Sequence, residues 1–243
     1  MKITSSVLYP TLACCVLIIS QVAQAEESSA TLEVTGTLTP GSCTPTLSNS
    51  GIIDYGTIYG MGLIASSNQL GVKNIDLTIV CDSPTMVAVY STDNRADSQA
   101  EVEIKNSWNS NSTISTPITK QRYGLGKTTA GKPIGAFSIG VDLEGLTVDA
   151  QAVSAIELLV TSNVNASNVS WTRTSTGALY EHSYSSWDAV TPGYYDYGRF
   201  YPIAFTNATL PLIISAAVSQ YNTLDTKDEI NLDGNVTLSM VYL

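Results

Sequence analysis

Short runs of alternating apolar and polar residues dominate this 243-residue chain after its first 25 residues. Residues 32–38, 75–81 and 236–242 each place mostly apolar residues at every second position. This period of two is typical of strands with one buried face, because successive side chains of a strand point to opposite faces. No stretch sustains the 3.6-residue period of an amphipathic helix. The sequence therefore predicts an all-β protein.

Further apolar runs at residues 85–92, 155–164 and 210–218 alternate with clusters of Gly, Pro, Asn, Asp and Ser. Many short strands joined by such turns are typical of a β-sandwich. We expect the first strand at residues 30–40 and a single sandwich domain over residues 26–243. Long loop insertions are expected around residues 95–130 and 171–205, where the pattern is less regular.

The first 25 residues have the features of a secretory signal peptide. Lys2 precedes an apolar run at residues 12–19, and Ala23-Gln24-Ala25 is a small-x-small cleavage signal. A lipoprotein signal ending at Cys15 explains the segment less well, because the apolar run continues past it. We expect a mature chain that begins at Glu26 and lies in the periplasm or at the cell surface.

Removal of this segment leaves two cysteines, Cys43 and Cys81. In an oxidising compartment a single pair indicates one structural disulfide, and two buried free thiols are the alternative. The bridge would close a loop of about 38 residues and contribute about 4 kcal/mol in the chain-entropy model.

The charge balance argues against nucleic acid and anionic membranes as partners. The chain has 11 Lys and Arg against 21 Asp and Glu, a net charge of −10. Phosphate-rich surfaces require a basic footprint, which is missing here. The longest strongly apolar run after the signal, residues 210–218, is too short to span a bilayer. We expect no transmembrane segment in the mature chain.

Two stretches resemble nucleotide- or metal-binding motifs only in part. Residues 126–133 approach a phosphate-binding loop, but Pro133 replaces the Ser or Thr that holds magnesium, so we expect a glycine-rich hairpin. Residues 229–234 begin like a calcium loop, but Met240 stands where the closing carboxylate is needed. One histidine and one cysteine pair do not make a zinc site. We expect no cofactor and no metal.

A hydrolase triad is the remaining catalytic hypothesis. Ser138, then Asp142 or Asp149, then His182 follow the chain order of such a triad. The nucleophile must stand on a turn from strand to helix, whereas residues around Ser138 are predicted as a continuous strand. We therefore expect that the protein is not an enzyme.

Three motifs resemble a known family. A TPGxCTP motif lies around residues 40–45, a GxxDYG motif at residues 51–56, and an LDGNVT…YL ending at residues 232–243. With these motifs the chain resembles the GltF-like proteins, a family of exported enterobacterial proteins of unknown function, over nearly all of residues 30–243.

The first and last thirds more distantly resemble pilin subunits of chaperone–usher systems, through the cysteine placement and the penultimate Tyr242. This resemblance implies an immunoglobulin-like sandwich that lacks its last strand. The resulting groove is filled first by a periplasmic chaperone and later by the N-terminal extension of another subunit. It implies partner contacts by Val236, Leu238, Met240 and Tyr242, with the carboxylate of Leu243 anchored in the chaperone.

The resulting hypothesis is a fimbrial-like structural and adhesive subunit. Only residues 26–29 precede the predicted first strand, so the subunit is expected to accept a strand but not to donate one, and to be terminal or accessory. Gly234 lies only nine residues before the end, closer than the glycine of pilins. The alternative is a free-standing periplasmic binding protein with a complete sandwich.

Aromatic residues are concentrated in residues 171–205, which hold ten of the nineteen in the chain. We expect most of them to pack, since large aromatics are usually mostly buried. Exposed Tyr and Trp also suit the binding of a host glycan or protein. Candidate ligand-binding residues are Tyr194, Tyr195, Tyr197 and Trp187.

Overall fold

The computed structural model describes residues 32–37, 41–109, 111–115, 120–149, 151–152, 156–181, 189–225 and 229–243. By its internal contacts the chain divides into two units, Met1–Thr39 and Pro40–Leu243. The predicted signal peptide lies outside the described residues. Within the described part, no helix is long and apolar enough to cross a membrane.

The described part of the first unit, residues 32–37, belongs to no helix or strand. The side chains of Leu32 and Val34 are both 87% exposed. The prediction of a first strand at residues 30–40 is therefore wrong for the described residues, and the first strand is β1 (Cys43–Leu47). A strand requires a partner edge, and among the described residues no strand pairs with residues 32–37.

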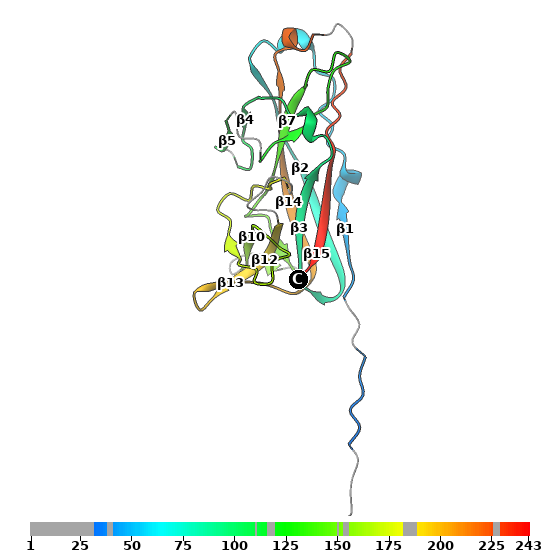
Figure 1. The fold of residues 1–243 in the computed structure, drawn as a ribbon, viewed down its shortest axis with the longest axis vertical. Coiled ribbons are helices and arrows are strands. Elements are labelled where there is room, and N and C mark those ends of the chain that lie inside the picture. The colour runs from blue at the N-terminus through cyan, green and yellow to red at the C-terminus, as the bar shows by residue number, and fades with distance from the viewer. Residues whose placement is uncertain are drawn as a thin grey trace, which may run out of the picture. The chain divides into compact units, whose positions relative to one another are not determined.

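The second unit is built from two antiparallel sheets (Figure 1). The first sheet has the order β1-β2-β14-β7-β6, and β8 and β9 extend it beside β14. Its further strands are β2 (Ser67–Thr85), β14 (Phe205–Ser219), β7 (Gly135–Val141), β6 (Tyr123–Gly124), β8 (Thr147–Val148) and β9 (Gln151–Ala152).

The second sheet has the order β11-β10-β12-β3-β15, and β13 pairs with β12. Its strands are β11 (Thr172–Arg173), β10 (Glu157–Thr161), β12 (Ala189–Asp196), β3 (Val87–Asp93), β15 (Val236–Tyr242) and β13 (Arg199–Pro202). A separate hairpin pairs β4 (Ile104–Lys105) with β5 (Thr113–Ile114). Short 3₁₀ turns lie at Ser48–Gly51, Gly60–Gly62, Ala96–Ser98 and Tyr221–Thr223.

One apolar core lies between the two sheets. Strand β14 contributes Leu210, Leu212 and Ile214 at alternate positions, and the facing sheet contributes residues such as Val89 and Leu158. Alternation along β14 buries one row of side chains against the other sheet, as a period of two requires. The predicted all-β, immunoglobulin-like sandwich is confirmed.

The predicted disulfide is also confirmed. Cys43 and Cys81 are bonded and lie directly opposite each other in the register of β1 and β2. The bridge fixes β1 to the long strand β2, so the outer strand of the first sheet is held covalently at its start.

Residues 53–58, which include the end of the GxxDYG motif, belong to no strand. One sequence-based assignment needs correction. Part of the loop insertion predicted at residues 171–205 is strand β12, which lies between β10 and β3 in the second sheet. The first five residues of β12 are all buried. Residues 189–193 form only a short run and are followed by many aromatic residues, so the sequence pattern did not indicate a strand here.

Candidate partner-binding groove

The two sheets each end in an edge strand, β1 in the first and β15 in the second. Strand β15 pairs with β3 along its whole length, from Val236 opposite Asp93 to Tyr242 opposite Val87. In the described strands, nothing pairs with the other side of β15. An edge of this kind presents backbone N–H and C=O groups that are available to a further strand.

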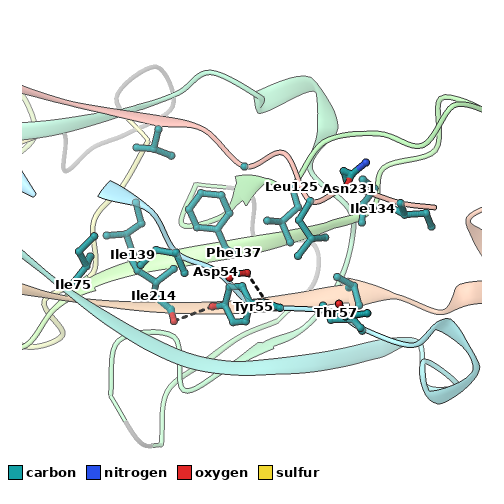
Figure 2. Close-up of a pocket in the computed structure, with 18 of the residues that line it drawn as sticks. Asp54, Tyr55, Thr57, Ile75, Leu125, Ile134, Phe137, Ile139, Ile214 and Asn231 are labelled. Carbon is teal, nitrogen blue, oxygen red and sulfur yellow. Dashed lines mark hydrogen bonds between the residues drawn. The ribbon is translucent and has the colours of Figure 1, made fainter. Parts of the chain in front are cut away.

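A groove of about 710 Å³ is bordered by residues of both edges. Leu47 of β1 lies in one wall, and Val236 and Leu238 of β15 lie in another. Most of the lining residues are apolar, but polar atoms, including those of Asp54 and Asn231, make up about as much of the accessible lining as apolar atoms do. Figure 2 shows 18 of the lining side chains. The apolar lining residues are Leu47, Ile53, Tyr55, Ile58, Leu63, Ile75, Leu125, Ile134, Phe137, Ile139, Leu212, Ile214, Val218, Leu224, Ile230, Leu232, Val236 and Leu238.

The floor of the groove is the sandwich core itself. Phe137 and Ile139 come from β7, and Ile214 comes from β14 (Figure 2). These side chains are at most 9% exposed. Sequence reasoning did not assign them to a site, because alternation marks a residue as core without telling whether the core is covered. The groove is therefore an opening onto the main core and not a separate surface pocket.

Tyr55 holds the segment of residues 52–59 against the groove. Its hydroxyl donates to the carbonyl oxygen of Ile214 (Figure 2) and to that of Gly71, at 3.3 Å in each case. Burial raises the pKa of Tyr55 to about 12. The Lys73 ammonium lies 5.9 Å from the centre of the ring. The GxxDYG motif thus places a tyrosine in the groove wall.

Three of the predicted partner-binding residues lie on one face of β15. Val236, Leu238 and Met240 are partly buried and pack against the main core. Thr237, between them, is exposed. The alternation predicted for this strand is present, and its apolar face is turned to the core at the border of the groove.

The other two predicted partner-binding residues, Tyr242 and Leu243, lie in a different environment. The Tyr242 hydroxyl accepts a hydrogen bond of 3.0 Å from the backbone N–H of Cys43, although its side chain is 51% exposed. The backbone N–H of Leu243 donates to the carbonyl oxygen of Met86. Tyr242 therefore bridges the end of β15 to the start of β1.

A second candidate site is the hairpin of β12 and β13. Its two-residue turn, Tyr197-Gly198, has positive φ at both residues, 43° and 84°, which is the conformation of a type I′ turn. Tyr194 pairs with Tyr201 across the hairpin, and their ring centres are 5.8 Å apart. Tyr195 pairs with Phe200 at 5.0 Å.

The rings of this hairpin are partly packed on each other but remain accessible. Tyr195 is 61% exposed and Tyr197 is 97% exposed, and Tyr194 and Tyr201 are each 40% exposed. Among the other aromatics of residues 171–205, Phe205 is fully buried. Trp187 lies outside the described residues.

The partial catalytic motifs have structural roles in the described residues. Ser138 lies within β7 at 1% exposure, and its hydroxyl donates to the carbonyl oxygens of Ser107 and Ser215. Hydrogen bonds from Thr206 hold the pKa of Asp149 below its ordinary value. His182 lies outside the described residues.

The glycine-rich stretch is a tight turn, in which the N–H of Thr128 donates to the carbonyl oxygen of Lys132. No group of three or more His, Cys, Asp or Glu side chains suited to a metal ion occurs in the part of the chain that the structure describes.

The fold and the groove thus define an all-β sandwich with a groove bordered by the edge strands β1 and β15. The chain is 36% identical to the protein GltF of Escherichia coli K12, over 91% of each chain. It is 30% identical to the uncharacterized protein YhcF of the same strain, over 87% of this chain and 90% of YhcF. Residues 32–138 match a family described as "Protein of unknown function (DUF1120)". The chain belongs to the GltF-like family.

Proposed function

We propose that the protein is an exported, non-catalytic structural and adhesive subunit of a fimbrial-like, chaperone–usher type. The observation that carries this proposal is the apolar groove beside the unpaired edge of β15. In this function, a strand from a partner enters the groove and completes the second sheet.

Strand addition suits a groove that lies beside an unpaired strand edge and has apolar lining residues. Backbone hydrogen bonds to an unpaired edge supply affinity, and alternate side chains in apolar pockets fix the register. Covering the partly buried lining residues, such as Val236 and Leu238, removes apolar surface from water at about 25 cal/mol per Å². The partners in this proposal are a periplasmic fimbrial chaperone and further subunits of the same assembly.

Two further features support the export and the adhesive part of the proposal. The Cys43–Cys81 disulfide suits an oxidising compartment such as the periplasm. The exposed tyrosines of the β12–β13 hairpin offer rigid area for a host glycan or protein, since such rings lose little conformational entropy on binding.

The test is co-expression in the periplasm with a fimbrial chaperone, followed by copurification. We expect a one-to-one complex, and we expect Leu238→Arg to weaken it at least ten-fold, because a charge then faces the apolar groove. Thr237→Arg is the matched control on the exposed face of the same strand and is expected to retain the complex. A chain that ignores the chaperone would contradict the proposal.

The volume of the groove favours one alternative, a free-standing periplasmic binding protein. Small-molecule sites typically occupy about 300–1,000 Å³, and this groove is about 710 Å³. The two functions differ in the copurification test. A binding protein would be purified as a stable monomer without the chaperone, and Leu238→Arg would then affect only a small ligand.

A further inference from the structure

We infer that the turn at residues 59–64, called the apolar turn below, docks onto the surface of a zwitterionic phospholipid bilayer. Its large apolar side chains Tyr59, Met61 and Ile64 are 80%, 92% and 77% exposed. None of these three side chains lines the groove. The inference therefore goes beyond the proposed function and does not depend on which partner enters the groove.

The backbone of the apolar turn is held in place by hydrogen bonds. The N–H of Gly62 donates to the carbonyl oxygen of Tyr59 at 3.0 Å, and the N–H of Tyr221 donates to that of Leu63, also at 3.0 Å. Gly60 packs so closely on the Tyr221 ring that a Cβ at this glycine would lie 2.5 Å from it. Because the turn is already ordered, it loses little backbone entropy when its exposed side chains bind.

The sequence around the apolar turn carries no charge. Residues 55–72 contain no Asp, Glu, Lys, Arg or His. Leu63 packs against the main core, whereas Tyr59, Met61 and Ile64 are turned to solvent. Entry of such a turn into the headgroup region desolvates no charged side chain, and tyrosine is enriched at membrane–water interfaces. The composition thus suits the boundary between water and lipid.

The exposed area favours a bilayer over a protein as the partner. At about 150–250 Å² for a large side chain, the three exposed residues together present roughly 500 Å². A stable protein–protein interface requires about 800 Å² from each partner. A bilayer sets no such requirement, because binding at its interface grows with whatever apolar area is inserted. The apolar turn is thus small for a protein interface and adequate for attachment to lipid.

The charges beside the apolar turn decide which lipid surface suits it. The turn borders the groove through Leu63, and Ser66, two residues after the turn, lines a second pocket of about 390 Å³. Among the described residues, the charged ones that line these two hollows are all acidic: Asp54, Glu101 and Glu229. They would repel anionic lipids. A zwitterionic headgroup instead presents its ammonium group to these carboxylates.

Docking through the apolar turn leaves the aromatic hairpin accessible. In Figure 1 the apolar turn (cyan) lies at one end of the second unit, whereas the hairpin of β12 and β13 lies toward the other end, near the C-terminus. The hairpin also exposes tyrosines, but Asp196 and Arg199 flank its turn, and both are exposed. It therefore provides a control surface that is aromatic but charged.

The test is flotation of the purified mature protein with vesicles of phosphatidylcholine. Met61→Asp should lower the partition coefficient about ten-fold, because a carboxylate would have to enter the apolar part of the interface. Met61→Leu should bind like the unmodified chain. Tyr197→Asp is the matched control, since Tyr197 is 97% and Met61 is 92% exposed, and it should also bind normally. Melting temperatures confirm that each variant is folded.

An unmodified chain that does not float with phosphatidylcholine overturns the inference. Equal losses in Met61→Asp and Tyr197→Asp overturn it too, because binding would then not be specific to the apolar turn. Stronger flotation when phosphatidylglycerol is added contradicts the role of the acidic residues. A dimer that is lost in Met61→Asp, measured by light scattering without vesicles, would assign the turn to a protein partner instead. The chaperone complex is measured without lipid, so its formation or failure tests the proposed function separately.

Discussion

Strands β14 and β15 both place apolar residues at alternate positions, Leu210 and Leu212 in β14 and Val236 and Leu238 in β15, but they differ in burial. Strand β14 pairs with β2 on one side and with β7 on the other, and Leu210 is 1% exposed. Strand β15 pairs only with β3 among the described strands, and Leu238 is only partly buried. The pattern decides which face of a strand is apolar, whereas the number of partners decides how far that face is covered. Among the described strands, β15 therefore has one unpaired edge, whereas both edges of β14 are paired.

The largest effect is expected from removal of the disulfide, which holds β1 at the border of the groove. Cys43→Ala with Cys81→Ala should lower the free energy of unfolding by about 4 kcal/mol, because the unfolded chain gains the entropy of an open loop. Urea unfolding measures this loss. A reducing agent should destabilise the unmodified chain to the same degree and should not change the stability of the variant. A variant whose urea midpoint equals that of the unmodified, oxidised chain would contradict the prediction.

The two strands are compared most directly by truncating one leucine in each. Leu210→Ala in β14 should cost about 2–5 kcal/mol, because it leaves a cavity in a covered core. Leu238→Ala in β15 should cost only about 1 kcal/mol in the isolated chain, because less of its surface is buried. Equal losses, measured by urea unfolding, would show that β15 is as fully covered as β14.

A smaller effect is expected at the contact that joins the ends of β15 and β1. Tyr242→Phe removes the acceptor of the Cys43 N–H and should cost about 1 kcal/mol. Tyr197→Phe, at a ring that is 97% exposed, is the control and should cost nothing measurable. Thermal melts of both variants give the comparison. A loss that is no larger for Tyr242→Phe than for the control would mean that this hydrogen bond does not hold the two edges together.

The groove wall should respond to alkaline pH through Tyr55. Burial raises its pKa from 10.0 to about 12, so the folded state keeps its proton to higher pH than the unfolded state. Its contribution to stability is complete below pH 10 and is lost as the pH rises from 10 to 12. Tyr55→Phe should make the midpoint of urea unfolding fall less steeply over that range. Some decline should remain, since burial also raises the pKa of Tyr123. Identical slopes would contradict this prediction.

The smallest effect on stability is expected at the tip of the aromatic hairpin. Tyr197→Asn places Asn-Gly, a preferred pair, in a turn with positive φ at both residues. The melting temperature should stay the same or rise slightly, while a highly exposed ring is lost. Binding to host glycans or cells would then be compared with the unmodified chain. Unchanged binding in this variant and in Tyr195→Ala would exclude these rings from adhesion.

The sequence alone predicted much of the fold, for physical reasons that are local. Alternation identified the apolar face of β2 and β15, an apolar run indicated β14, and the count of cysteines predicted the Cys43–Cys81 bond. Residues 30–40 show the same alternation, yet the described part of them is not a strand. A local pattern contains no information on whether a partner edge is available.

Most of the candidate groove could not be predicted from the sequence, because a local pattern does not show how the edges of the two sheets are arranged. Phe137 and Ile139 have the pattern of ordinary core residues, and only the arrangement of the two sheet edges makes them a groove floor. The bond between Tyr242 and Cys43 joins residues 199 positions apart, which no local signal specifies. The interpretation of residues 236–242 as a recognition element came from a family resemblance and remains a hypothesis.

The most direct test of an accessible edge is amide hydrogen exchange along β14 and β15. It is measured on the isolated monomer at low concentration and again in a one-to-one complex with a fimbrial chaperone. We predict that the amides on the free edge of β15 exchange much faster than those of β14 in the monomer and become protected in the complex. Protection of β15 equal to that of β14 in the isolated monomer would contradict the account, because the sandwich would then be complete without a partner.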